Sequence, residues 1–385
     1  MTTIAVIHPD FSVKGGAEAV CMNVLEALQD QYDVTLFTTQ TPDFEKLNPY
    51  YNADVGNITV RVPTSSTILN EAIGSRLGLL KYALLNRAIR ESLHAFDLVI
   101  GTFNELGTDG NPILYFHHPV YSQPKVALDA RDQSGSRDVY TEFCRYIAGA
   151  STERIRNSMA LANSDWMANL VEEEYNIRPK TVYPPVDTEE FDPAPHDEKE
   201  NGFVSIGRFA PDKNILRNIE IIARLHERGH DVHLHLIGPP HMSDYQQQIE
   251  ARAEKHDFVH IENEVSREEL VQLVNTHRYG LHGKNNEHFG MVVAEMVAGE
   301  ALPFVPNSGG QREIVNNQST LLYDSVSEAV ENIDTVLSNP EFERKLRTNL
   351  PSITEQFGRD RFRTEIRTVV GGELDSPSPR TIKVE

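Results

Sequence analysis

Residues 280–310 read GLHGKNNEHFGMVVAEMVAGEALPFVPNSGG. The run contains a short apolar segment at 280–282, a polar loop, a longer apolar stretch from Gly290, and a second short apolar segment at 302–305 before a glycine pair. Short apolar runs separated by helical sequence are typical of parallel strands joined by a covering helix. The segment therefore predicts a strand, a helix that begins near Gly290, and a second strand that ends in a glycine loop.

The same alternation extends over the whole chain and predicts the α/β class. In the first half the candidate strands are 4–8, 34–38, 58–62, 98–101, 113–117, 160–163 and 181–183. In the second half they are 203–207, 232–238, 259–262, 280–282, 302–305 and 320–323. Each half therefore has enough strands, with helical sequence between them, to form a Rossmann-like domain.

Length and composition also favour two domains. A chain of 385 residues exceeds the size of one comfortable core, and the acidic, proline-containing run DTEEFDPAPHDEKENG interrupts the apolar pattern. We predict an N-terminal domain over 1–186, a linker over 187–202, a C-terminal domain over 203–357, and a terminal helix with a frayed tail over 358–385. Open α/β sheets bind ligands at the carboxyl ends of their strands, so we expect the chemistry in a cleft that the two domains face.

Composition excludes several classes of protein. The formal net charge is -21, from 57 acidic and 36 basic residues, which disfavours nucleic acid as a partner and is also compatible with adaptation to salty surroundings. No segment approaches the roughly 18 to 20 apolar residues that cross a bilayer, and the N-terminus lacks a signal pattern, so we expect a cytoplasmic protein. The two cysteines have no metal-ligand spacing and no cluster of aspartates stands out, so we expect neither a metal nor another cofactor.

Two positions are candidates for binding a phosphate. Gly15 and Gly16 follow the first predicted strand and open a helix, where small residues and free backbone N–H groups suit an anion. Arg208 and Lys213 follow the strand at 203–207, and two cations at one strand end can grip a diphosphate and neutralise it as it leaves. The alternatives are an ordinary strand-to-helix turn in the first case and solvated surface cations in the second.

The loop and helix at 286–295 carry two carboxylates in different settings. Glu287 lies in the loop, where it can meet a bound sugar, whereas Glu295 lies in the helix, where it can accept hydrogen bonds from ribose hydroxyls. The alternative is a pair of solvated charges. We assign binding of the rest of the donor to the intervening residues His288, Phe289, Gly290 and Met291, with free N–H groups at Phe289 and Gly290.

Several motifs together resemble one enzyme family. Arg208 with Lys213 five residues later, the Glu-x7-Glu element and the Ser-Gly-Gly loop at 308–310 resemble the retaining GT-B glycosyltransferases of glycosyltransferase family 4. The further motifs YFHHP at 115–119 and YPPVD at 183–187 are similar to the branch of that family that adds α-1,2-linked mannose to dolichol-linked oligosaccharides. The resemblance spans nearly the whole chain.

The resemblance implies a GT-B fold and a role for each matched residue. Arg208 and Lys213 would hold the donor diphosphate, Glu295 the ribose, and Glu287 would face the sugar near its reacting carbon. Gly16 and His118 would meet the phosphate and the sugar from the opposite domain. For the pair at 117–118, one core and one surface histidine at a strand end remain the alternative.

The resemblance further implies a retaining transfer of a hexose from a nucleoside diphosphate sugar. GDP-mannose is the favoured donor, a glycan or polyprenyl-linked molecule is the acceptor, and no metal is required. A leaving phosphate oxygen can take the acceptor proton while Glu287 and the cations stabilise charge. Two other functions stay open, a sugar-nucleotide epimerase on a similar fold and a catalytically silent glycan-binding subunit.

Residues 74–94, GSRLGLLKYALLNRAIRESLH, have a local charge opposite to that of the whole chain. A basic and apolar helix can rest on an anionic membrane and bring a lipid-linked acceptor to the enzyme. The alternative is an amphipathic helix that covers the sheet and leaves its cations in solvent.

Overall fold

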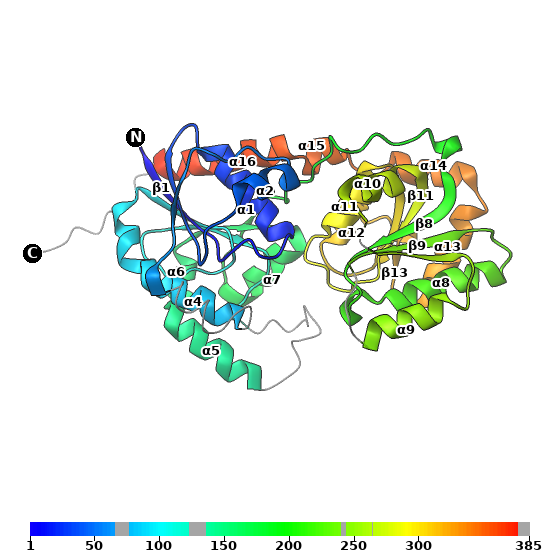
Figure 1. Ribbon diagram of the computed structural model, residues 1–385, viewed down its shortest axis with the longest axis horizontal. Coiled ribbons are helices and arrows are strands. Elements are labelled where there is room, and N and C mark those ends of the chain that lie inside the picture. The colour runs from blue at the N-terminus through cyan, green and yellow to red at the C-terminus, as the bar shows by residue number, and fades with distance from the viewer. Residues whose placement is uncertain (66–76, 123–135, 240–243, 264, 376–385) are drawn as a thin grey trace, which may run out of the picture. The chain divides into compact units, whose positions relative to one another are not determined.

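The structure is a computed structural model that describes residues 1–65, 77–122, 136–239, 244–263 and 265–375 (Figure 1). It divides into two compact units. Unit 1 contains the described residues up to Pro185 and those from Arg359 onward, and unit 2 contains those from Val186 to Gly358.

Unit 1 is built on a seven-stranded parallel sheet in the order β3-β2-β1-β4-β5-β6-β7. Its strands are β1 (Thr3–Ile7), β2 (Asp33–Phe37), β3 (Thr59–Arg61), β4 (Leu98–Gly101), β5 (Ile113–Phe116), β6 (Met159–Ala162) and β7 (Lys180–Thr181). Its helices are α1 (Gly16–Leu28), α2 (Phe44–Tyr51), α4 (Gly78–Ile89), α5 (Ser136–Ala148), α6 (Thr152–Arg156), α7 (Asp165–Tyr175) and α16 (Arg359–Asp375), with a 3-10 turn η1 (Arg90–Ala95). The order reverses between β1 and β4, which is where open sheets of this kind bind ligands.

The last helix, α16, belongs to the core of unit 1 and lies along α1 (Figure 1). Its residues Phe362, Ile366 and Val370 are buried in the same apolar cluster as Val24 of α1. Arg363 adds an ion pair 2.6 Å from Glu26. The C-terminal segment therefore completes the first domain although the whole of unit 2 precedes it in the sequence.

Unit 2 is built on a six-stranded parallel sheet in the order β10-β9-β8-β11-β12-β13. Its strands are β8 (Glu200–Ile206), β9 (His233–Ile237), β10 (Val259–Glu262), β11 (His277–Leu281), β12 (Leu302–Pro306) and β13 (Leu322–Tyr323). Its α-helices are α8 (Ile215–Glu227), α9 (Asp244–Ala253), α10 (Arg267–Thr276), α11 (Met291–Ala298), α12 (Gln311–Ile314), α13 (Val326–Leu337), α14 (Pro340–Thr348) and α15 (Ile353–Phe357). Its 3-10 turns are η2 (His196–Glu198), η3 (Pro211–Lys213) and η4 (Ser319–Leu321). Here the order reverses between β8 and β11, so the loops after these two strands are the natural ligand-binding position.

Each apolar run identified in the sequence forms a strand, and the α/β class is confirmed. The segment predicted as a linker is different, because residues 187–202 lie in unit 2 and β8 already begins at Glu200. Phe191 is buried in the core of unit 2, and the buried Lys199 donates to the Gly299 carbonyl at 2.5 Å. Acidic and proline-rich composition marks polar surface, but it does not reveal that a lysine can be buried against backbone carbonyls.

Among the described residues, no helix combines the length and the apolar character that crossing a bilayer requires.

Candidate active site

The loops after β8 and β11 bring together two residues that lie 74 positions apart in the sequence. Lys213 belongs to η3 after β8, and Glu287 lies in the loop after β11. The Lys213 Nζ atom lies 2.9 Å from Glu287 Oε2, and the two side chains are only 17% and 13% exposed. The strand order thus joins the predicted diphosphate-binding cation and the predicted sugar-facing carboxylate.

Two further side chains complete the surroundings of Glu287. His282 Nε2 lies 3.2 Å from Glu287 Oε2, and Lys284 Nζ lies 3.4 Å from Oε1. Burial lowers the pKa of His282, so the neutral ring donates its N–H to a carboxylate that can only accept.

These neighbours determine the charge of Glu287. Burial by itself would raise the pKa of this carboxyl group, but the charge of Lys213, the hydrogen bond from His282 and the charge of Lys284 outweigh it. The pKa of Glu287 therefore lies well below its ordinary value, and the side chain is an anion at neutral pH.

The backbone of Glu287 is fixed by the glycine loop that follows β12. Gly310 N–H donates to the Glu287 carbonyl at 2.8 Å, and the Asn286 N–H donates to Ser308 Oγ at 2.9 Å. Gly309 has φ +79°, and a Cβ atom there would lie 2.3 Å from the Glu287 carbonyl oxygen. Only glycine permits this close contact, which gives the Ser-Gly-Gly motif a structural reason.

The helical carboxylate is also held in place. Glu295 lies in α11, where its Oε1 is 2.9 Å from Arg267 Nη2. Arg267 in turn lies 2.7 Å from Glu190 through its Nε atom, so one guanidinium orients two carboxylates. Sequence reasoning missed Arg267, because a single arginine at the start of a helix with charged neighbours carries no distinguishing pattern.

The remaining predicted donor-binding residues of unit 2 lie in the same two loops and at the start of α11. Arg208 lies two residues after the end of β8; its side chain is exposed and makes no ion pair within the described ranges. Phe289 is buried with its ring 5.4 Å from that of Phe357, and Gly290 caps α11. His288 and Met291 are partly buried on either side of these two residues.

In unit 1 the predicted phosphate turn begins α1, but one of its amides is already occupied. The Gly15 N–H donates to Glu18 Oε2 at 3.1 Å, whereas Gly16 is the first residue of the helix. Burial raises the pKa of Glu18 to about 7. The Gly15 amide is therefore not open to a phosphate while this bond is present, which differs from the sequence expectation for that residue.

The two histidines after β5 have different environments. His117 is buried, its Nε2–H donates to the Thr102 carbonyl at 3.1 Å, and burial lowers its pKa to about 3. His118 is only partly buried. The backbone N–H groups of both residues donate to Asn104 Oδ1, at 2.7 and 2.8 Å. His117 is thus a core residue, and the buried Asn104, which sequence reasoning missed, positions the backbone of His118.

The described part of the basic segment 74–94 forms α4 and η1. Residues 74–76 lie outside the described residues. Tyr82, Leu85 and Ile89 of α4 are buried, whereas Arg87 is exposed. This part of the segment therefore covers unit 1 with its apolar side.

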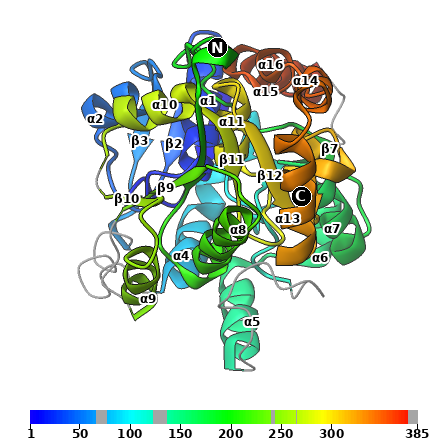
Figure 2. The same ribbon diagram turned by 90° about the vertical axis from the view of Figure 1, so that its right-hand side faces the viewer.

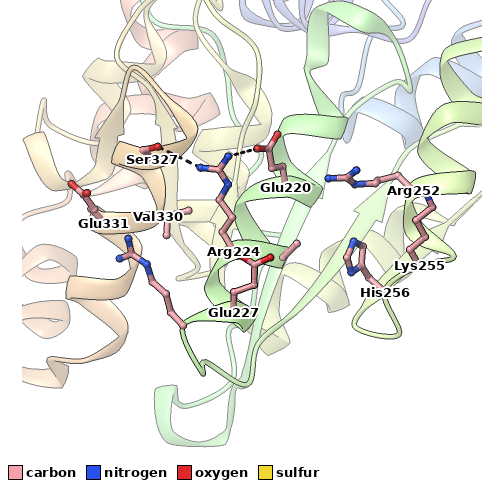
Figure 3. Close-up of a pocket in the computed structure, with 11 residues that line it drawn as sticks. Glu220, Arg224, Glu227, Arg252, Lys255, His256, Ser327, Val330 and Glu331 are labelled. Atoms are coloured by element: carbon pink, nitrogen blue, oxygen red, sulfur yellow. Dashed lines mark hydrogen bonds and ion pairs between the residues drawn. The ribbon is translucent and has the colours of Figure 1, made fainter.

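An open pocket elsewhere in unit 2 contains none of the predicted site residues. It is lined by side chains from α8, α9 and α13 (Figure 3). Arg224 in this pocket lies 2.6 Å from Glu220 and 3.4 Å from Ser327 Oγ, and Arg228 lies 2.9 Å from Asp334. Because this pocket contains none of the residues of the sequence motifs, we place the candidate active site at the β8 and β11 loops.

Two family descriptions match the chain. Residues 14–190 match "Glycosyltransferase Family 4", and residues 186–352 match "Glycosyl transferases group 1". The curated relatives include the "GDP-Man:Man(3)GlcNAc(2)-PP-Dol alpha-1,2-mannosyltransferase" of Mus musculus, 27% identical over 81% of this chain and 73% of that protein. The protein of the same name from Xenopus laevis is 29% identical over 93% of this chain and 85% of its own length.

Solved structures show the same fold. Anabaena HepE in complex with UDP matches with a TM-score of 0.70 at 14% identity, covering 97% of this chain and all of that one. WaaG, a glycosyltransferase involved in lipopolysaccharide biosynthesis, matches with a TM-score of 0.65 at 15% identity, covering 94% of this chain and 99% of that one. At these identities the likeness establishes the architecture alone.

Proposed function

We propose that the chain transfers mannose from GDP-mannose to a lipid-linked glycan with retention of configuration. The chain belongs to the GT-B glycosyltransferases of family 4 and is thus a nucleotide-sugar-dependent hexosyltransferase. The curated relatives from Mus musculus and Xenopus laevis support the choice of sugar and acceptor, since both are named as α-1,2-mannosyltransferases that use GDP-mannose and a dolichol-linked glycan.

The observation that carries the proposal is the buried anion at Glu287 among Lys213, His282 and Lys284. A sugar that loses its diphosphate develops positive charge at the anomeric carbon and negative charge on the leaving group. Glu287 supplies a fixed negative charge for the first, and Lys213 with Arg208 supplies positive charge for the second. Because Glu287 and Lys213 are already held against each other, little reorganisation of these two charges is needed during the reaction.

The proton of the acceptor hydroxyl needs no strong base of the protein. In a retaining transfer the diphosphate leaves from the face that the acceptor attacks, so a phosphate oxygen can receive that proton. His282 is buried and engaged with Glu287, which makes it a positioning residue for the carboxylate and not a proton acceptor. We propose that transfer itself needs no metal, since two side-chain cations already serve the leaving group.

Further donor contacts are proposed from the family resemblance. Glu295, oriented by Arg267, is assigned to the ribose hydroxyls, and the backbone around Phe289 and Gly290 to the sugar or its phosphate. From unit 1 we assign Gly16 to the phosphate and His118 to the sugar.

A lipid-linked acceptor requires the enzyme to work at a membrane surface. Helix α5, which extends outward from α4 in both views, exposes Val139, Phe143 and Tyr146 at 75%, 54% and 81% (Figures 1 and 2). These residues are spaced four and three apart and so share one side of the helix. Helix α4, which contacts α5, carries cations. We propose that this exposed side of α5, together with those cations, is where a cytoplasmic, peripheral protein touches an anionic membrane.

The test is transfer of radiolabelled mannose from GDP-mannose into a lipid extract by the purified chain. We expect label in the lipid phase, and we expect the double variant Arg208→Ala with Lys213→Ala to lose donor binding and turnover. Lys255→Ala, which removes a lysine of the pocket in Figure 3, serves as the matched control. Unchanged turnover in the double variant would refute the assignment, and an isomerised donor without labelled lipid would identify an epimerase.

A further inference from the structure

Histidines gather at the other end of the unit 2 sheet. His233 and His235 lie on β9, His260 on β10 and His277 on β11. His233 and His235 are two residues apart and share one face of the sheet, and His260 is paired in register with His235. The cluster lies toward the start of the strands, whereas Glu287 follows their carboxyl ends. The seven residues of β8 separate these ends by roughly 20 Å.

Three of these rings have the spacing of a metal site. One ring nitrogen from each of His233, His235 and His277 lies within 4.8 Å of those of the other two. His233 Nε2 and His277 Nε2 are 3.0 Å apart. Tetrahedral zinc with nitrogen ligands at about 2.0 to 2.1 Å places those nitrogens about 3.3 Å from one another. Small side-chain adjustments therefore suffice to bind an ion.

A glycine in the intervening strand makes room for the rings. Gly202 of β8 is paired in register with His233, and a Cβ atom at this position would lie 2.2 Å from His233 Nε2. Any other residue here would fill the space in which the rings of β9 and β11 meet across β8. The absence of a side chain at Gly202 is thus a condition of the cluster.

The outer contacts of the rings leave the correct nitrogens for a metal. The Nδ1 of His277 lies 2.7 Å from the Leu273 carbonyl, and the Nδ1 of His235 lies 2.8 Å from Glu262 Oε1. Both oxygens can only accept, so each Nδ1 carries a proton, and Nε2 is the nitrogen whose lone pair can bind an ion. A carbonyl or carboxylate behind the ring is the usual arrangement for a metal-binding histidine.

The cluster is also reachable by an ion and has a further oxygen close by. The side chains of His233 and His235 are 25% and 15% exposed and line an open pocket together with Glu200 and His260. Glu200 Oε2 lies 3.5 Å from His233 Nε2. A carboxylate or a water molecule can therefore complete four ligands.

We propose that His233, His235 and His277 bind one divalent transition-metal ion, with Zn²⁺ as the preferred ion and Glu200 or water as the fourth ligand. The ion takes the place of the proton shared between His233 and His277 and ties β9 to β11 across β8. Its position at the start of the strands separates it from sugar transfer, so its effect is on the stability of unit 2. Sequence reasoning did not predict a metal here, because the ligands come from two strands and only the His-x-His pair on β9 is local.

The test uses the full-length chain without a histidine tag, after treatment with a chelator. We expect one equivalent of Co²⁺ to bind and give the intense visible absorption of tetrahedral nitrogen ligation, with competition by Zn²⁺. At roughly a hundredfold excess over its Kd, Zn²⁺ should raise the Tm by about 5 °C or more. Removing the ion should leave mannose transfer intact, so the failure of this proposal and that of the proposed function are distinguishable.

Variants complete the test. The double variant His233→Gln with His277→Gln should lose the Co²⁺ absorption and the Tm increase, whereas His256→Gln, outside the cluster, should keep both. Gly202→Ala should weaken binding with all ligands still present, and circular dichroism of the metal-free proteins checks that each variant folds. Binding that is absent in the wild type, or unchanged in the double variant, would show that the histidines are only hydrogen-bonded to one another.

Discussion

The two ends of the unit 2 sheet hold clusters of titratable side chains with opposite electrostatic character. At the carboxyl ends, the Glu287 carboxylate is surrounded by two lysines, Lys213 and Lys284, and by the neutral ring of His282. At the start of the strands, the rings of His233 and His277 contact each other directly, and the carboxylates of Glu200 and Glu262 lie on the outer side of the cluster. A cluster of opposite charges stabilises a fixed anion, whereas a cluster of neutral rings has lone pairs that a cation can use. The same sheet thus has two different kinds of side-chain cluster at the two ends of its strands.

The largest expected effect comes from removing the charge at the carboxyl end. Glu287→Gln keeps the size of the side chain but removes the anion, and we expect kcat to fall by about 10²- to 10³-fold. Co²⁺ binding at the histidines should not change. Glu331→Gln, in the pocket of Figure 3, is the control. A kcat within about threefold of the wild type would remove Glu287 from the reaction.

A second prediction concerns the backbone that holds this carboxylate. Gly309→Ala places a Cβ atom against Glu287 at a φ of +79°, so we expect Glu287 to shift and kcat to fall by about tenfold to a hundredfold. Gly229→Ala is the matched control, because Gly229 also has a positive φ, +92°, but a Cβ atom there would meet nothing within 4 Å. Equal losses in the two variants would contradict the role given to Gly309.

A smaller effect is expected from the residue that orients Glu295. Arg267→Gln removes the ion pairs with Glu295 and Glu190, and we expect the KM for GDP-mannose to rise by about tenfold with kcat less affected. Isothermal titration with GDP should show the same weakening. A fall in kcat with unchanged KM would place Glu295 at the reacting sugar and not at the ribose.

The smallest effect is a pH dependence of folding stability. The folded pKa of Glu287 is below the ordinary value of 4.5, so above about pH 4.5 its full contribution to stability is present, and this contribution is lost as pH falls through the folded value. The difference in free energy of unfolding between wild type and Glu287→Gln should therefore shrink as the solution is made more acidic. Urea titrations at several pH values measure it, and a difference that grows on acidification would contradict the charge assigned to Glu287.

The sequence predicted the strands well, because apolar runs bounded by polar loops record burial directly. It also placed Lys213 and Glu287 in two strand-end loops. Their contact depends on β8 and β11 being neighbours in the sheet, and no local sequence pattern indicates the order of the strands. His282 and Lys284 stand close to the Glu287 motif, so attention to the short loop after the strand at 280–282 would have found them.

Other features had no local signal. Asn104 and Arg267 each act through two contacts with residues distant in the sequence, and such residue types are common on any surface. The histidine cluster depends on Gly202, whose role appears only when strands far apart in the sequence are aligned. The Glu18 contact that occupies the Gly15 amide likewise depends on geometry and not on residue type.

The return of α16 to unit 1 affects how the chain is made. A ribosome completes Val186–Gly358 before it releases the helix that fills the core beside α1. Part of the apolar surface of the N-terminal sheet therefore stays uncovered until α16 has been synthesised, whereas the second unit already has all of its own strands. Unit 1 thus begins to emerge from the ribosome first but is completed last. In a nascent chain halted just after residue 358, unit 2 should resist protease and unit 1 should be cut.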